Sequence, residues 1–192
     1  MSHRVGLDQS TVVEAAAKLV DEEGIEQLTL GRLAERLGVR TPSLYNHIAG
    51  LPGLKRELML YCLRDVYNRV TRATIGKSRT EAIVAVANAY RAYARETPGR
   101  YAFTLQAPEP GDQELAAIAQ QLVEVLQAIL APYRLGQQNA IHAIRSLRSI
   151  VHGFISLEVA GGFGMPVDLD ASFHWLINAF IAGLEQKSDT SL

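Results

Sequence analysis

Apolar residues recur every three or four positions along most of the chain, which is the spacing that places them on one face of an α-helix. Runs of β-branched residues bounded by hairpin turns, which would indicate strands, are absent. The sequence therefore predicts an all-α protein of about nine helices. We expect an N-terminal helix-turn-helix unit of three helices over residues 1–50 and a larger C-terminal helical domain over residues 51–192.

The ends of the first two helices follow from capping and turn residues. Asp8 can accept hydrogen bonds from the free N–H groups of a helix that Gly24 ends. A second helix begins after Thr29 and ends at Gly38, whose backbone permits the sharp turn that follows.

The third helix is expected to start at Pro42, because proline lacks the N–H that would be unpaired at the first helical position. Thr41 would be its cap, and Leu44 and Ile48, four residues apart, would face inward. The opposite face would carry the polar side chains of Arg40, Ser43, Asn46 and His47.

The later helices are separated by glycine, proline and polar segments. We expect them beyond Pro52 to about residue 76 and over about residues 80–96, 100–106, 112–130, 137–159 and 170–186. The segments 108–111 and 161–166 are expected to be loops.

Charge is distributed unevenly along a chain whose net charge is only −1. Residues 29 to 56 carry one acid, Glu35, and five basic side chains, those of Arg32, Arg36, Arg40, Lys55 and Arg56. We expect the acids near the end of the first helix to face away from a phosphate backbone; they are Asp21, Glu22, Glu23 and Glu26. The pattern predicts a basic patch on a nearly neutral protein.

The remaining composition excludes several classes of protein. With 48% hydrophobic and 20% charged residues, the chain is expected to fold rather than stay disordered. The single Cys62 permits no intramolecular disulfide, and the five histidines lack metal-ligand spacing, so we expect no metal or cofactor. No apolar signal segment or membrane span is evident, which predicts a cytoplasmic protein with no membrane partner.

The predicted order of helix, glycine-containing turn and short helix is that of a helix-turn-helix, in which the second helix enters the major groove of DNA. This spacing alone occurs in other helical hairpins. The run from Leu28 to Ile48, LTLGRLAERLGVRTPSLYNHI, resembles the DNA-binding signature of the tetracycline-repressor (TetR) family, and the resemblance extends over about residues 8–60. It implies double-stranded operator DNA as a partner.

The resemblance also assigns roles to individual residues. It implies phosphate contacts for Thr29, Tyr45 and His47, and positions at or near base edges for Arg40, Thr41, Pro42, Ser43 and Asn46. Two residues depart from the family pattern: Ile48 replaces a common aromatic, and Leu51 replaces a usual lysine at the start of the fourth helix. The second change removes an expected phosphate contact, for which Lys55 or Arg56 would partly substitute.

The C-terminal part is similar to TetR ligand-binding and dimerisation domains of a type named for a Trp-His-Gly triplet. The similarity rests on residues 98–101 (PGRY), 151–154 (VHGF) and Gly161-Gly162, with Val151 in place of the tryptophan. It implies an unidentified small-molecule effector. Candidate effector-binding residues are Tyr61, Tyr90, Tyr93, Phe103, Arg148 and His152.

Each candidate also has a purely structural interpretation. Aromatic residues at helical spacing are usually core residues, and His152 can simply satisfy a buried carbonyl. Arg145 and Arg148 can form ion pairs with Glu158 or face solvent.

Apolar residues extend around the last two helices, which suggests a homodimer interface as well as a core. The resemblance implies a four-helix bundle with two helices from each subunit. The candidate interface residues are Leu147, Val151, Phe154, Ile155, Phe173, Leu176, Ile177 and Phe180, and an ordinary core is the alternative.

Together these features predict a ligand-responsive repressor without enzymatic activity. A homodimer would bind a near-palindromic operator whose half-sites lie ~34–36 Å apart, and a small molecule would release it. One alternative is a small helical enzyme that uses side chains around the C-terminal cavity, those of His142, His152, Glu158 or His174. Another is a helical interaction module that binds no DNA.

Overall fold

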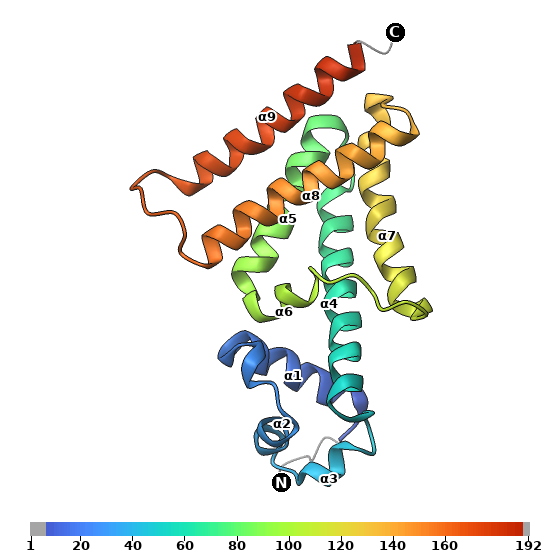
Figure 1. Ribbon diagram of the computed structural model, residues 1–192, viewed down its shortest axis with the longest axis vertical. Coiled ribbons are helices and arrows are strands. Elements are labelled where there is room, and N and C mark those ends of the chain that lie inside the picture. The colour runs from blue at the N-terminus through green and yellow to red at the C-terminus, as the bar shows by residue number, and fades with distance from the viewer. Residues whose placement is uncertain (1–6, 190–192) are drawn as a thin grey trace. The chain divides into compact units, whose positions relative to one another are not determined.

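The computed structural model describes residues 7–189, and every element in this range is a helix (Figure 1). The all-α prediction is confirmed. The chain divides into two compact units: unit 1 comprises Met1–Asp65 and Thr97–Leu115, and unit 2 comprises Val66–Glu96 and Ala116–Leu192. This division differs from the expected boundary at residue 50, because the first part of the fourth helix and a later segment both pack with the helix-turn-helix.

Unit 1 contains α1 (Gln9–Glu23), the 3₁₀ turn η1 (Ile25–Gln27), α2 (Leu30–Leu37), α3 (Thr41–Leu44), the first part of α4 (Gly50–Thr74) and α6 (Pro98–Phe103). Unit 2 contains the rest of α4, α5 (Arg79–Glu96), most of α7 (Gln113–Leu130), η2 (Ala131–Tyr133), α8 (Gln137–Val159) and α9 (Leu169–Asp189). The two 3₁₀ turns are absent from the sequence-based prediction.

The expected cap of the first helix and the expected start of the second are confirmed. Asp8 Oδ1 accepts a hydrogen bond of 2.8 Å from the N–H of Thr11, and Thr29 Oγ1 accepts one of 3.2 Å from the N–H of Arg32. Gly38 has a φ of 66°, in the left-handed region that glycine adopts without steric cost.

The expected start of α3 is wrong by one residue. Arg40, not Thr41, precedes the helix with an extended backbone, at φ −85° and ψ 143°, and Thr41 is the first helical residue. No side-chain hydrogen bond caps this short helix. Pro42 still lies in the first turn, where its missing N–H costs nothing.

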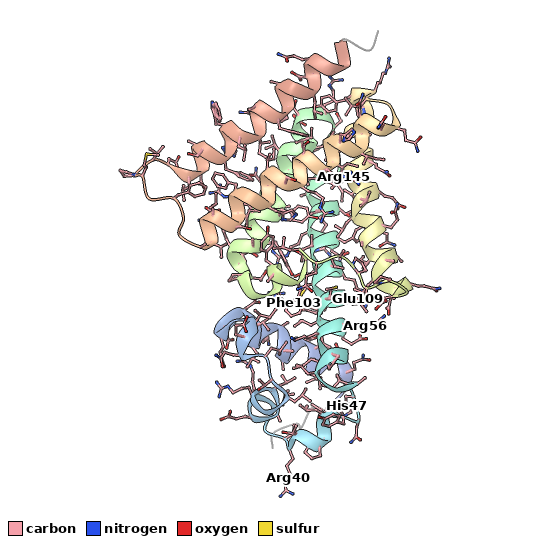
Figure 2. The ribbon with its side chains drawn as sticks, viewed as in Figure 1. Arg40, His47, Arg56, Phe103, Glu109 and Arg145 are labelled. Carbon is pink, nitrogen blue, oxygen red and sulfur yellow. The ribbon has the colours of Figure 1, made fainter. Side chains whose placement is uncertain are left out.

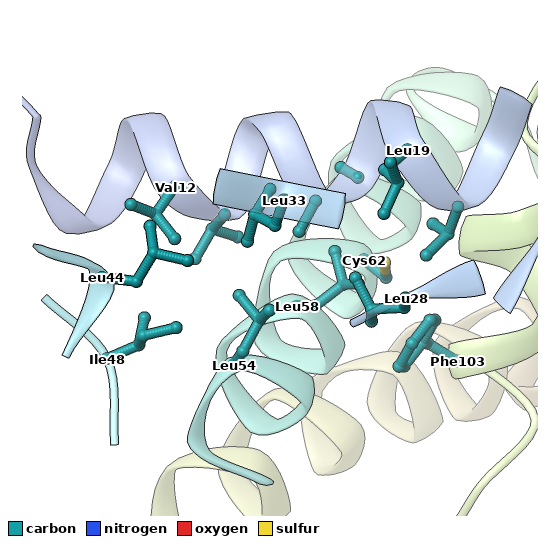
Figure 3. Packing of buried hydrophobic residues seen from close by; sticks show 14 of the residues in the cluster. Val12, Leu19, Leu28, Leu33, Leu44, Ile48, Leu54, Leu58, Cys62 and Phe103 are labelled. Atoms are coloured by element: carbon teal, nitrogen blue, oxygen red, sulfur yellow. The ribbon is translucent and has the colours of Figure 1, made fainter. Parts of the chain in front are cut away.

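The core of unit 1 joins α1, α2, α3, α4 and α6 (Figure 3). Leu44 and Ile48 are buried, as predicted, and fix the short α3 against the other helices. Leu33 of α2 and Leu54 of α4 are fully buried in the same cluster. Phe103 reaches this core from α6, although it lies far along the chain.

The N-terminus of α6 packs against the end of α1. A Cβ on Gly99 would lie 1.9 Å from the carbonyl oxygen of Val20, so only glycine permits this approach. Arg100 donates to the Asp21 carboxylate from its backbone N–H (2.9 Å) and from Nε (2.6 Å), and its Nη1 lies 3.2 Å from an oxygen of Asp65. These bonds attach residues 97–115 to the helix-turn-helix.

A buried arginine joins three helices of unit 2. Arg91 of α5 donates from Nε and Nη2 to the carboxylate of Glu158 on α8, at 2.8 and 2.7 Å. The same Nη2 lies 2.8 Å from Asp170 of α9. Its guanidinium also lies 5.4 Å from the ring centroid of Phe154 and 4.8 Å from that of Phe173.

One helix of the described residues, Gln113–Tyr133, is long and apolar enough by length and composition alone to cross a membrane. It coincides with α7 and η2. Its buried side chains in unit 2 include Leu122, Leu126, Ile129 and Leu130, and the helix also carries the exposed polar residues Gln120, Gln121, Glu124 and Gln127. This pattern is that of a helix packed on one face within a protein.

Candidate functional site

The helix-turn-helix presents a polar surface because its apolar side chains point into the core of unit 1. Leu33 and Leu44 are buried, while Arg40 points away from the body of the unit (Figure 2). Tyr45 keeps 59% of its surface exposed, which is unusual for an aromatic side chain with no partner to cover it.

The residues predicted to contact DNA are all at least partly accessible. Thr41, Ser43 and His47 are half-buried, and the exposed ones are Thr29, Arg40, Pro42, Tyr45, Asn46 and Lys55. Thr29 also accepts the capping hydrogen bond of α2, which leaves its hydroxyl hydrogen to donate to a phosphate oxygen. Their roles in DNA binding stay predictions.

The acidic cluster of α1 does not face away from the basic patch, contrary to expectation. Glu23 lies 2.6 Å from Arg32, and Glu22 lies 2.7 Å from Arg36. Arg32 also pairs with Glu35 at 2.9 Å. Opposite charges close in sequence are free to pair once α1 and α2 pack together, so most of the predicted positive charge is compensated.

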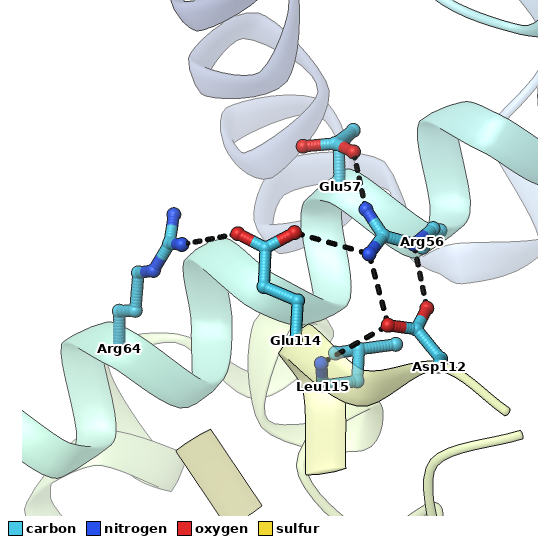
Figure 4. Close-up of polar contacts among 6 residues, drawn as sticks. All are labelled: Arg56, Glu57, Arg64, Asp112, Glu114 and Leu115. Carbon is cyan, nitrogen blue, oxygen red and sulfur yellow. Dashed lines mark hydrogen bonds and ion pairs between the residues drawn. The ribbon is translucent and has the colours of Figure 1, made fainter. Parts of the chain in front are cut away.

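The positive charge of Arg56 is compensated by carboxylates as well (Figure 4). Its Nε and Nη2 donate to Asp112 at 2.6 and 2.9 Å, and further contacts of 2.7 and 3.1 Å reach Glu57 and Glu114. Glu114 in turn accepts from Arg64 at 2.7 Å. Hydrogen bonds from Arg56 and from the N–H of Leu115 lower the pKa of Asp112.

Two cations of the basic patch therefore remain. Among the described residues, neither Arg40 nor Lys55 has an ion-pair partner in the structure, and both side chains are exposed. Leu51, which replaces the family's lysine, is half-buried and packs against the unit 1 core. Two residues were expected to substitute for that lysine. The charge of Lys55 is free to contact a phosphate, whereas that of Arg56 is paired with carboxylates.

The predicted effector-binding residues fall in different units. Tyr61 and Phe103 belong to unit 1, where Phe103 is 2% exposed within the core. Tyr90, Tyr93, Arg148 and His152 belong to unit 2. The structure thus provides no single described cluster that holds the full set.

In unit 2, Tyr90 and His152 lie together. Their ring centroids are 5.2 Å apart in an edge-to-face arrangement. Burial raises the pKa of Tyr90 to about 12 and lowers the pKa of His152 to about 4. The nearby charge of Arg148 lowers both pKa values. Tyr93 is fully buried, and the guanidinium of Arg69 lies 5.1 Å from its ring centroid.

The side chains proposed for an enzymatic site do not form one. Glu158 is held by Arg91 rather than by Arg145 or Arg148. His142 and His174 are exposed on α8 and α9. No group of three histidine, cysteine, aspartate or glutamate side chains that could hold a metal ion occurs among residues 7–189.

Most residues predicted for the dimer interface are buried within a single chain, as in the alternative interpretation given for them above. Leu176 and Phe180 are half-buried, and the buried ones are Leu147, Val151, Phe154, Ile155, Phe173 and Ile177. They pack among α5, α8 and α9, so a partner subunit is not needed to cover them.

A different surface of α8 and α9 is exposed, and it includes Phe180, one of the residues predicted for the interface. Trp175 of α9 is 75% exposed. The same two helices form a shallow groove of about 230 Å³, lined by Leu135, Asn139, His142, Ala143, Ser146, Ala179, Phe180, Gly183 and Leu184. The small residues Ala143, Ser146, Ala179 and Gly183, spaced three or four apart, are the sequence signal for a face that admits close packing.

Comparison with known proteins places both parts of the chain in one family. Residues 12–48 match the sequence profile of bacterial regulatory proteins of the tetR family, and residues 83–180 match that of the tetracyclin repressor-like C-terminal domain. An uncharacterised HTH-type transcriptional regulator of Mycobacterium tuberculosis is 34% identical over 95% of this chain and 84% of its own length. YobS of Bacillus subtilis, also an uncharacterised HTH-type regulator, is 34% identical, with 96% of both chains covered.

The chain belongs to the TetR family.

Solved structures agree with this assignment. A TetR variant of Acinetobacter baumannii in complex with minocycline superposes with a TM-score of 0.71 at 25% identity, over 94% of this chain and 98% of that one. A Rhodococcus protein of unknown function superposes with a TM-score of 0.81 at 18% identity, over 96% and 99%, and shares the fold. This TetR-family protein is a helix-turn-helix transcriptional regulator that binds DNA. Its more specific similarity to the Trp-His-Gly type stays a prediction.

Proposed function

We propose that this TetR-family regulator acts in the cytoplasm as a homodimeric repressor, which binds a near-palindromic operator and is released by a small molecule. One observation carries the DNA-binding mode. Arg40 and Lys55 keep their charges uncompensated, while the other arginines of residues 29–56 are paired with carboxylates. Uncompensated cations are the groups that can replace counterions on a DNA backbone.

The two cations have different roles in this proposal. Arg40 lies at the start of α3, beside the residues expected at base edges, and supplies sequence preference together with Thr41, Ser43 and Asn46. Lys55 lies on α4, near its start, and contacts phosphate. Thr29, Tyr45 and His47 also contact phosphate and fix the register of the protein on the duplex.

Fluorescence anisotropy with the gene's own upstream DNA, at two salt concentrations and with random duplex as competitor, tests the proposal. Arg40→Ala should weaken specific binding by about 1–3 kcal/mol and relax sequence preference. Lys55→Gln should weaken binding to both duplexes and lower the salt slope by about 1. Lys77→Gln is the matched control, because Lys77 is exposed but lies in unit 2. Equal affinity for both duplexes would overturn the proposal.

The homodimer is proposed to form through the exposed face of α8 and α9. An aromatic side chain as exposed as Trp175, one helical turn before Ala179 in a groove lined partly by small residues, is typical of an interaction site. A twofold axis brings the same patch of both subunits together, so the side chain and the groove can complement each other.

Trp175 is the single tryptophan of the chain, so its fluorescence reports on this face alone. Its emission should shift to shorter wavelength as the protein concentration rises and a dimer appears in sedimentation. Trp175→Ala should raise the dimer dissociation constant by roughly 30-fold, as for a tryptophan at the centre of an interface. Ile75→Ala truncates an equally exposed apolar side chain elsewhere and should have no effect. A monomer at all concentrations would exclude this interface.

The effector is proposed to bind in unit 2 near Tyr90, Arg148 and His152. Their ring contact and electrostatic coupling support this location. The Acinetobacter relative in complex with minocycline supports a small molecule as the class of effector. Such a ligand releases DNA only if it binds the released conformation better than the DNA-bound one.

A further inference from the structure

A cavity of about 490 Å³ lies inside unit 1, apart from the effector region proposed above. One wall is a single face of α4, formed by Pro52, Lys55, Arg56 and Met59, which are spaced three and four residues apart. Ile25 of η1 also lines the cavity. The segment from the end of α6 to the start of α7 supplies the other lining residues, Phe103, Gln106, Ala107, Glu109, Asp112 and Leu115.

The side chains that line the cavity suit a small organic molecule. Ile25, Met59, Phe103 and Leu115 offer apolar surface, and the volume falls within the range of about 300–1,000 Å³ that is typical of ligand pockets. Methionine and phenylalanine provide polarizable and aromatic surface, which also favours a cation.

The ion pairs around the cavity determine whether a cationic or an anionic ligand is favoured there. Arg56 already contacts three carboxylates, those of Glu57, Asp112 and Glu114, so its charge is not free for an anionic ligand. Glu109 lines the cavity, and its carboxylate has no ion-pair partner among the described residues.

The lining residues, their ion-pair partners and Arg64, which pairs with one of these partners, together carry one more negative than positive charge. The cations are Lys55, Arg56 and Arg64, and the carboxylates are Glu57, Glu109, Asp112 and Glu114. Lys55 is exposed, and its long flexible side chain can turn to solvent.

We propose that this cavity is a binding site for a small amphipathic organic cation, with the apolar part against Met59 and Phe103 and the cationic group at Glu109. The Arg56 and Asp112 pair closes the site by holding the start of α7 to α4. Occupation of the cavity does not require the proposed operator or the proposed effector site in unit 2.

Methionine methyl NMR of the full-length protein tests the site directly. The chain has three methionines; Met59 lines the cavity, and Met165 lies 80% exposed in the loop between α8 and α9 as an internal control. Decyltrimethylammonium should shift the Met59 signal in a saturable way and leave Met165 unchanged. Decanoate has an apolar chain of similar length and an anionic head, and should bind more weakly. Met59→Leu assigns the signal.

Variants separate the contribution of the Glu109 charge to ligand binding from that of the cavity volume. Glu109→Gln should weaken decyltrimethylammonium binding about two- to fivefold, the effect of one exposed ion pair. Glu124→Gln, an exposed glutamate of α7 in unit 2, is the matched control and should change nothing. Ala107→Trp should fill the cavity and abolish binding, with an unchanged circular dichroism spectrum as evidence of folding.

Three results would overturn the proposal. They are an unchanged Met59 signal at saturating cation, a decanoate affinity equal to or greater than that of the cation, and a Glu109→Gln affinity equal to that of the parent protein. None of these measurements contains DNA, so their failure is distinct from a failure of operator binding.

Discussion

Arg56 in unit 1 and Arg91 in unit 2 each bind a carboxylate through the same two nitrogens, but the two side chains differ in burial. Arg56 donates from Nε and Nη2 to Asp112 at 2.6 and 2.9 Å, and Arg91 donates from the same atoms to Glu158 at 2.8 and 2.7 Å. The Arg56 side chain is 36% exposed, whereas that of Arg91 is 7% exposed between two aromatic rings.

The difference in burial decides what each pair contributes. Water and salt screen the Arg56 cluster, which acts mainly by orienting the start of α7. The Arg91 cluster is hardly screened, so removal of one partner leaves a charge buried without compensation. Bond geometry alone would rank the two clusters as equal.

The largest expected effect comes from Arg91→Ala. It should lower the free energy of unfolding by about 3–5 kcal/mol, because Glu158 stays buried without its partner. Chemical denaturation at neutral pH measures the loss. Arg95→Ala is the matched control: Arg95 lies one turn further along α5, is 58% exposed and meets Asp170 only at 3.7 Å. Similar losses for both variants would contradict the role of burial.

Acidification is expected to have an intermediate effect on the free energy of unfolding. The loss should begin with the protonation of His152 in unit 2. Burial holds the pKa of His152 at about 4, below the ordinary value of 6.5, so the unfolded chain binds the proton more readily. The stability that this group contributes is complete above pH 6.5 and is lost as the pH falls towards 4, by up to about 3 kcal/mol.

Denaturation curves between pH 7 and pH 4 check this prediction. His152→Gln should flatten the dependence of stability on pH in that window, whereas His142→Gln, on an exposed part of the same helix, should keep it. In unit 1, the lowered pKa of Asp112 means that its ion pair with Arg56 is lost only as the carboxylate protonates, below the ordinary value of 3.8. An unchanged slope in His152→Gln would contradict the assignment.

The smallest effect on the free energy of unfolding is expected for Arg56→Ala. The loss of unfolding free energy should stay within about 1 kcal/mol and should shrink at high salt, because exposed ion pairs are screened. Denaturation at low and high sodium chloride measures it beside Arg91→Ala, whose loss should persist. A loss at Arg56 that salt does not reduce would show that this cluster behaves as a buried one.

Local features of unit 1 were predictable because they depend on neighbouring residues. The cap at Asp8 and the turn at Gly38 follow from hydrogen-bonding capacity and backbone freedom within a few positions. Helical spacing predicted the inward positions of Leu44 and Ile48, and both are buried, although Ile48 lies beyond the end of α3. The cap of α3 was misplaced, because Thr41 can occupy either the capping or the first helical position.

Pairing between segments was not predictable in the same way. Arg32, Arg36 and Arg56 were counted as a basic patch, but Glu23, Glu22 and Asp112 compensate them once the helices pack. Likewise, the apolar residues of α8 and α9 suggested an interface, whereas those such as Ile155 and Phe173 are the core of one chain.

The amino-acid sequence by itself determined the helical elements, the helix-turn-helix and the family, since these rest on periodicity, caps and a contiguous motif. Only the tertiary structure decided which cations stay uncompensated, which apolar residues remain exposed, and that residues 97–115 pack beside α1 and α4. The physical reason is that charge compensation and burial depend on distances between residues far apart in the chain, and a one-dimensional pattern carries no information on those distances.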